Sequence, residues 1–251
     1  MALWGRPSAC GGLSGRRIGC FVTTPKARFL QQAMAIAGKD LRSELRTKET
    51  LNASVSFALV ILLLFAFAFD PSAETVRDIS GGLLWLAFAF AAVLILNRGF
   101  ARELTNDCLE TLLHSPTSGP QLFLGKCVSN YLMLLVVEAV CYPVFCLFYD
   151  VRWTPQWPML LLVMLLCTWG LTAVGTMFSA MTVNLRLREL MLPIMLYPLM
   201  IPMLMAAMQL TTSLIAGEPV GLASFGIRLL VVSDVIFTML AFALVEVVLI
   251  G

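Results

Sequence analysis

The chain has 251 residues, of which 59% are hydrophobic and only 13% are charged, and its formal net charge is +2. A soluble domain carries about 25% charged residues, so this composition excludes a soluble globular protein and favours a chain embedded in lipid. The small net charge gives no indication of a nucleic-acid partner.

The N-terminal part of the chain contains two different patterns. Segment 1–25 is rich in Gly, Ser and Arg, and no acidic residue precedes Asp40. This is typical of a flexible or targeting segment, such as an organellar transit peptide, with a disordered bacterial N-terminus or an over-extended start site as alternatives. In segment 26–50, apolar residues recur at helical spacing among charged ones. We predict an amphipathic helix in the membrane interface; a helix packed on the protein's own loops is the alternative.

Six segments are apolar and long enough to cross about 30 Å of hydrocarbon as helices. The predicted spans are 51–69, 79–96, 128–149, 159–183, 190–216 and 227–250. The fifth span contains Pro193, Pro198 and Pro202, so we expect it to be kinked or interrupted. The sequence therefore predicts an all-α polytopic membrane protein with a six-helix transmembrane domain over 51–251.

Lysine and arginine predict the orientation of the spans. Of the 17 such residues, fourteen lie in the N-terminal segment or in the connections after the second and fourth spans. The opposite side has Arg77, Arg152 and Arg228. Because positively charged loops stay in the cytoplasm, we expect both termini on the cytoplasmic side of a bacterial inner membrane. The inner membrane of an organelle is the alternative.

The longest polar connection is 97–126. Phe100, Leu104, Cys108 and Leu112 recur there at every fourth residue, and Ser115-Pro116 ends this helical pattern. A short amphipathic helix below a membrane bundle is a suitable contact for a soluble partner subunit. A solvated loop with one self-packed helix is the alternative.

Motifs for catalysis or metal binding are not evident in the sequence. Segment 119–127 has the glycines and lysine of a phosphate loop, but five residues separate the glycines and Cys127 replaces the Ser or Thr that would bind magnesium. His114 is the only histidine. The seven cysteines include no CxxC pair, and we interpret them as small buried hydrophobic residues. We predict a non-catalytic subunit without a metal site.

Two carboxyl groups fall inside predicted spans. Glu138 lies near the middle of the third span, and Asp234 about a third of the way into the sixth. A charge at the bilayer centre costs at least about 2.5–3.5 kcal/mol, so both side chains should face the bundle interior. Each belongs either to a substrate or proton path, or to a protonated carboxyl that is hydrogen-bonded to a neighbouring hydroxyl group.

Several short motifs occur in an order that resembles one known family. Those that carry the resemblance are Lys39-Asp40-Leu41-Arg42-Ser43-Glu44-Leu45-Arg46, a first span ending Phe69-Asp70-Pro71, Leu96-Asn97-Arg98-Gly99-Phe100, Asp107-Cys108-Leu109-Glu110 and Leu124-Gly125-Lys126. Over residues 35–250 the chain resembles the cytochrome c maturation protein B family, also called haem exporter protein B.

The resemblance implies the permease subunit of an ABC transporter for cytochrome c biogenesis, with the helix bundle of an ABC-2-type exporter. It implies a role in haem export or in ATP-driven release of a haem-loaded chaperone, with haem as a transported or handled ligand. The implied partners are a separate ABC ATPase subunit, a haem-handling membrane subunit and a small single-span subunit, in addition to membrane lipid. The implied ATPase-coupling residues in the 97–126 loop are Phe100, Glu103, Asp107, Leu109 and Glu110.

Two other functions fit the same residues. An ABC-2-type permease for a lipid, polysaccharide or drug would have the same bundle and the same coupling loop. An ATP-independent proton-coupled carrier would centre on Glu138.

Overall fold

The computed structural model describes residues 25–69, 74–105, 119–149, 156–182, 185, 187–217 and 223–250. The helices in these ranges are α1 (Pro25–Thr47), α2 (Glu49–Ala68), α3 (Glu74–Thr105), α5 (Gly119–Phe148), α6 (Trp157–Thr182), α7 (Arg188–Ala216) and α8 (Ala223–Ile250). The predicted all-α class is confirmed for this part of the chain.

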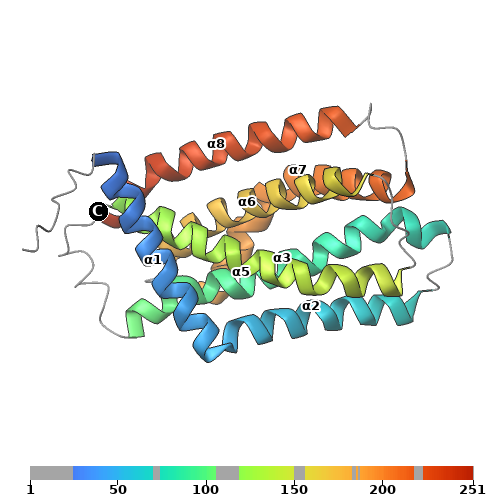
Figure 1. Ribbon diagram of the computed structural model, residues 1–251, viewed down its shortest axis with the longest axis horizontal. Coiled ribbons are helices and arrows are strands. Elements are labelled where there is room, and N and C mark those ends of the chain that lie inside the picture. The colour runs from blue at the N-terminus through green and yellow to red at the C-terminus, as the bar shows by residue number, and fades with distance from the viewer. Residues whose placement is uncertain are drawn as a thin grey trace, which may run out of the picture.

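Six of these helices are long and apolar enough to cross a membrane, namely α2, α3, α5, α6, α7 and α8. They run along one common direction and form an elongated bundle (Figure 1). A helix satisfies its own backbone hydrogen bonds, which lipid cannot do, so such a bundle suits a bilayer. The described ranges thus contain six candidate membrane spans, as predicted.

Two helices extend farther than the expected spans. α3 continues beyond residue 96 to Thr105, and α5 begins at Gly119 instead of near residue 128. Pro120 is compatible with this start because a proline in the first turn of a helix removes an amide that has no partner there. The connection expected over 97–126 is therefore helical at both ends, and its central part, 106–118, lies outside the described residues.

The centre of the bundle is formed by α3 and α6. In their most apolar segments, 67% of α3 and 61% of α6 is buried inside the protein. The buried share is only 28% in α2 and 17% in α8. Trp85 and Phe88 of α3 and Leu171 of α6 are fully buried in the core. The outer faces of α2 and α8 carry exposed large apolar residues, including Phe67 and Met239, which in a membrane would contact acyl chains.

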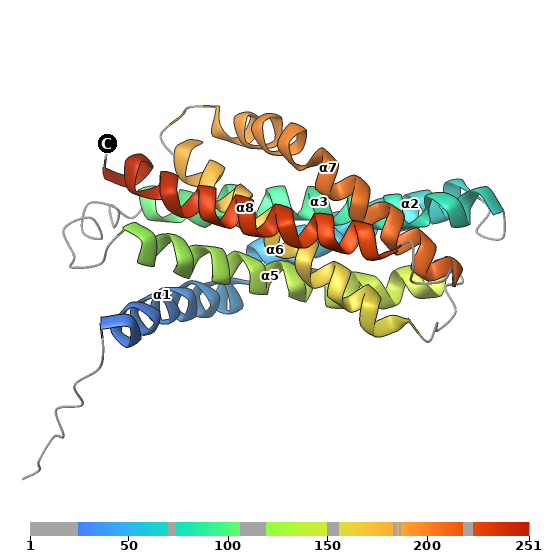
Figure 2. The same ribbon diagram turned by 90° about the horizontal axis from the view of Figure 1, so that it is seen from above.

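α1 lies outside the six-span bundle and packs on the N-terminal half of α5 (Figures 1 and 2). Its small residues Ala33 and Ala37 are buried. A Cβ atom built on Gly125 of α5 would lie 2.7 Å from the Ala33 carbonyl oxygen and 2.8 Å from Ile36 Cβ. The missing side chain at Gly125 therefore permits this close approach. Placement of α1 in the membrane interface stays a prediction.

α7 contains all three prolines of the fifth span within one continuous helix. Figure 2 shows that this helix changes direction along its length. Proline lacks an amide hydrogen and its ring crowds the preceding turn, which explains the bend. The expected kink is thus present, and the helix is not interrupted.

Candidate functional site

The residues predicted to couple to an ATPase fall at the end of α3 and beyond it. Phe100 and Glu103 lie in the last two turns of α3, whereas Asp107, Leu109 and Glu110 lie outside the described residues. Just before this segment, residues 96–99 of α3 are held by contacts with α2, α5 and α6, and Lys126 of α5 links them to α1. The coupling role of all five residues stays a prediction.

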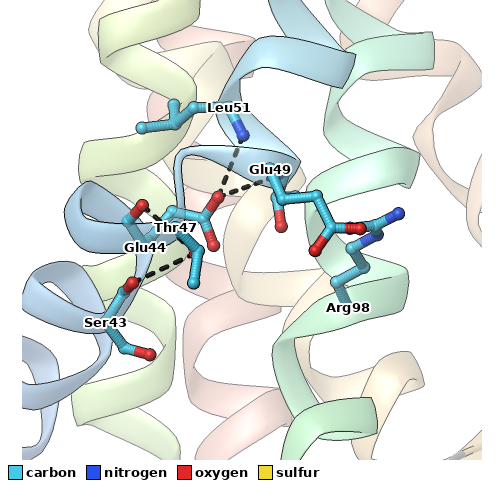
Figure 3. Close-up of polar contacts among 7 residues, drawn as sticks. Ser43, Glu44, Thr47, Glu49, Leu51 and Arg98 are labelled. Atoms are coloured by element: carbon cyan, nitrogen blue, oxygen red, sulfur yellow. Dashed lines mark hydrogen bonds and ion pairs between the residues drawn. The ribbon is translucent and has the colours of Figure 1, made fainter.

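α1 and α2 meet in an elbow at Lys48, whose backbone is left-handed with φ 54°. Beside the elbow, Glu44 is only 1% exposed. Its Oε1 accepts hydrogen bonds from the amides of Thr50 at 2.7 Å and Leu51 at 3.0 Å (Figure 3). These amides belong to the first turn of α2 and have no partner within the helix. Glu44 therefore fixes how α2 leaves α1, and its negative charge suits the positive end of the α2 dipole.

An exposed ion pair connects the elbow to α3. Arg98 Nη1 lies 2.7 Å from Glu49 Oε1, and Figure 3 shows the two side chains reaching toward each other. The side chains are 44% and 67% exposed. Water competes with a pair of this kind, so its contribution is at most about 1 kcal/mol.

A buried ion pair connects the same end of α3 to α1 and α5. Lys126 of α5 is 3% exposed, and its Nζ lies 2.9 Å from Asp40 Oδ2 on α1. The same Nζ donates a hydrogen bond of 2.9 Å to the Gly99 carbonyl oxygen on α3. A buried ammonium group requires such partners because it has lost its water. Gly99 directly precedes Phe100, so this network holds the start of the predicted coupling segment.

α5 and α6 add further polar contacts to the last turns of α3. Ser179 of α6 donates a 2.7 Å hydrogen bond to the Leu96 carbonyl oxygen. Asn130 of α5 donates to Thr176 of α6 at 3.1 Å, and its side chain lies against Gly99, where a Cβ would be 3.3 Å away. Residues 96–99 of α3 are therefore held by direct contacts with α2, α5 and α6, and Lys126 links them to α1. The sequence pattern assigned Lys126 to the polar 97–126 connection, so it gave no signal for the buried position of this residue in the network.

Glu138 lies buried about two thirds of the way along α5, with 3% of its surface exposed. Thr168 of α6 donates a hydrogen bond to its Oε1. Glu138 faces the bundle interior, as expected for a carboxyl group at this depth. The contact matches the interpretation of a carboxyl group bonded to a hydroxyl across a helix interface; a substrate or proton path stays a prediction.

Asp234 of α8 is also buried, and neither of its carboxyl oxygens has a hydrogen-bond partner among the described residues. It packs tightly on α6, since a Cβ on Gly170 would lie 2.5 Å from its Oδ1. Thr168, which bonds to Glu138, and Gly170, on which Asp234 packs, are two residues apart on α6. The two carboxyl groups therefore occupy the same region of the bundle, on either side of α6.

A groove of about 850 Å³ lies between α3, α7 and α8, at the end of the bundle away from the elbow. Its lining is largely apolar, with Gln209, Thr212 and Ser213 as polar residues. This surface suits an apolar molecule with a polar edge, a description that fits lipid as well as many cargoes.

Cys127, Cys141 and Cys167 are buried and free, as expected for cysteines that act as small hydrophobic residues.

Comparisons with known proteins agree with one another. The family model described as CcmB protein matches residues 31–251. Heme exporter protein B of Rhodobacter capsulatus is 27% identical over 176 residues, which cover 70% of this chain and 80% of the relative. Heme exporter protein B of Paracoccus denitrificans is 29% identical over 170 residues (68% and 78%). Heme exporter protein B of Pseudomonas aeruginosa is 31% identical over 174 residues (69% and 77%).

Proposed function

We propose, from the premise that this chain belongs to the CcmB protein family, that it is the membrane permease subunit of an ABC transporter for cytochrome c biogenesis. In this role it takes part in haem export or in the ATP-driven release of a haem-loaded chaperone. The observation that carries the proposal is the family match over residues 31–251, which includes all six candidate spans. A six-helix bundle alone would fit many transporters.

The family implies an ABC exporter whose ATPase is a partner, and this chain is a membrane transporter subunit. We assign ATP hydrolysis to a separate chain. We further propose a haem-handling membrane subunit and a small single-span subunit as partners. The location that we propose is a bacterial inner membrane with both termini in the cytoplasm, which the distribution of lysine and arginine supports.

The proposed docking site for the ATPase is the segment that begins at the end of α3. Replacing Glu103 and Glu110 by lysine reverses two charges there, and we expect the ATPase to co-purify at least about tenfold less well. Membrane insertion should be unchanged, because neither residue lies in a candidate span. Glu189→Lys, an exposed change at the start of α7, is the control. Unchanged co-purification of the double variant would remove both residues from the docking site.

A deletion strain tests the proposed pathway. Loss of this chain should abolish holo-cytochromes c and leave b-type haem proteins at normal levels, and a plasmid copy should restore the loss. Normal cytochromes c in the deletion strain would contradict the proposal and favour a permease for another cargo. Transport by the isolated chain in liposomes without ATP would instead favour a proton-coupled carrier.

A further inference from the structure

We propose that Lys126 is a positioning residue that couples movement of the α3 end to α1. The idea rests on the proposed function in one respect: a partner ATPase must act on the segment that follows Gly99. It goes beyond that function because it assigns the route by which such an action reaches the membrane bundle. The route runs from α3 through a buried ammonium group to α1 and the elbow that leads into α2.

The position of Lys126 is set by the crossing of α1 and α5. Gly125, the preceding residue, lets the α1 backbone approach so closely that a Cβ atom would lie 2.7 Å from the Ala33 carbonyl oxygen. The Lys126 side chain therefore emerges where α1 and α5 touch. From there its Nζ contacts Asp40 Oδ2 and the Gly99 carbonyl oxygen, each at 2.9 Å.

Because Lys126 is buried, breaking its contacts with Asp40 and Gly99 is costly. With 3% of Lys126 exposed, water has little access to its ammonium group. If Gly99 moved away alone, a buried donor would lose a partner that water does not replace, which is costly. It is therefore more favourable for α1 and the end of α3 to move together. The exposed Arg98–Glu49 pair at the same end lacks this property, because water can replace either partner.

A pair of apolar substitutions separates coupling from folding. Removing one member of a buried ion pair leaves an uncompensated charge and destabilises the fold, whereas replacing both by apolar residues of similar size is often neutral. The test variant is therefore Lys126→Met with Asp40→Leu, and its thermal stability in detergent should stay close to that of the wild type. Glu49→Gln, which breaks the exposed pair, is the matched control.

The readout is hydrogen exchange of α1 in the complete complex, with and without a non-hydrolysable ATP analogue. In the wild type and in Glu49→Gln, nucleotide should change amide exchange in α1. In the double variant this response should fall by about tenfold, within the usual range of coupling between sites. The ATPase should still co-purify with it, and holo-cytochrome c formation should fall in parallel.

A wild-type nucleotide response of α1 in the double variant would overturn the inference. The inference would also be overturned if Glu49→Gln lost the nucleotide response of α1 as fully as the double variant does. The buried ion pair would then have no special role in coupling. If no ATPase co-purifies with the wild-type chain, the proposed function fails first, and that outcome is recognised before any variant is compared.

Discussion

Three buried polar side chains in this protein bond to the backbone of another helix. Tyr149 donates to the Leu62 carbonyl oxygen at 3.1 Å, and Ser179 donates to that of Leu96 at 2.7 Å. Glu44 accepts from two amides of the next helix. Between helices in lipid, apolar burial gives little driving force, so such bonds help to determine which helices pack together.

Glu44 should be one of the most sensitive single residues. Glu44→Ala leaves the amides of Thr50 and Leu51 without their acceptor in a buried place, and we expect a loss of about 2–3 kcal/mol in the free energy of unfolding. Glu49→Ala, in the exposed pair, should cost at most about 1 kcal/mol. Unfolding in mixed detergent micelles, followed by circular dichroism, measures both. Equal losses would show that Glu44 has no special role in the elbow.

Thr168 should matter through its bond to Glu138. Thr168→Val keeps the shape of the side chain and removes the donor, which leaves a buried carboxyl oxygen unsatisfied and should cost about 1–3 kcal/mol. Thr182 of the same helix donates to the Phe178 carbonyl oxygen of its own backbone, so Thr182→Val should change stability by less than about 0.5 kcal/mol. The same unfolding assay compares them, and similar values for the two variants would contradict the role given to Thr168.

The buried carboxyl groups were predictable and the buried lysine was not. Glu138 and Asp234 interrupt apolar runs, so the sequence itself shows that they must face inward. Lys126 borders a polar connection and has the pattern of a loop residue. Its burial depends on Asp40 and Gly99, which reach it only through the packing of three helices. No local pattern records such a contact.

At the scale of helices, the packing of α1 on α5 depends on the space at Gly125. In Gly125→Val the new atoms would overlap the Ala33 carbonyl group and Ile36, so α1 must move away, at a cost of about 1–3 kcal/mol. Gly38 of α1 has nothing within 4 Å of a built Cβ. Gly38→Ala should therefore stabilise α1 by about 0.5–1 kcal/mol.

Limited proteolysis in detergent checks this pair of variants. Cleavage within α1 should become faster in Gly125→Val and should stay the same or become slower in Gly38→Ala. Faster cleavage in both variants, or in neither, would contradict the packing of α1 on α5.

Hydrophobic patterning predicted that each spanning helix exists but gave less information on where it ends. The length of an apolar run reports the thickness of lipid that a helix must cross. α3 continues to Thr105 and α5 begins at Gly119, both beyond their apolar runs. Neighbouring helices contact the first of these added residues in α3, at Gly99, and pack on α5 at Gly125. Contacts of that kind are tertiary, so hydropathy does not reveal them.

For the whole molecule, the six candidate spans lead us to expect both ends of the chain and the 106–118 connection on one side of the membrane. The number of spans was predictable from composition and length, and the orientation depends on the distribution of charge. We expect a cysteine placed at His114, in an otherwise cysteine-free chain, to react with an impermeant reagent from the cytoplasmic side only. A cysteine at Ser72, after the first span, is the control and should react from the opposite side. Reversed labelling would exclude a cytoplasmic ATPase at the α3 end.

The prolines of α7 have a consequence for motion. Because Pro198 and Pro202 carry no amide hydrogen, the carbonyl groups of Ile194 and Pro198 lack their usual helical partner. Further flexing at this point breaks few additional backbone bonds, and the unbranched side chain of the buried Met203 readily refills the altered space. We therefore expect the curvature of α7, with three internal prolines against one in α5, to change at a low energetic cost, and the width of the groove beside Pro202 to follow it.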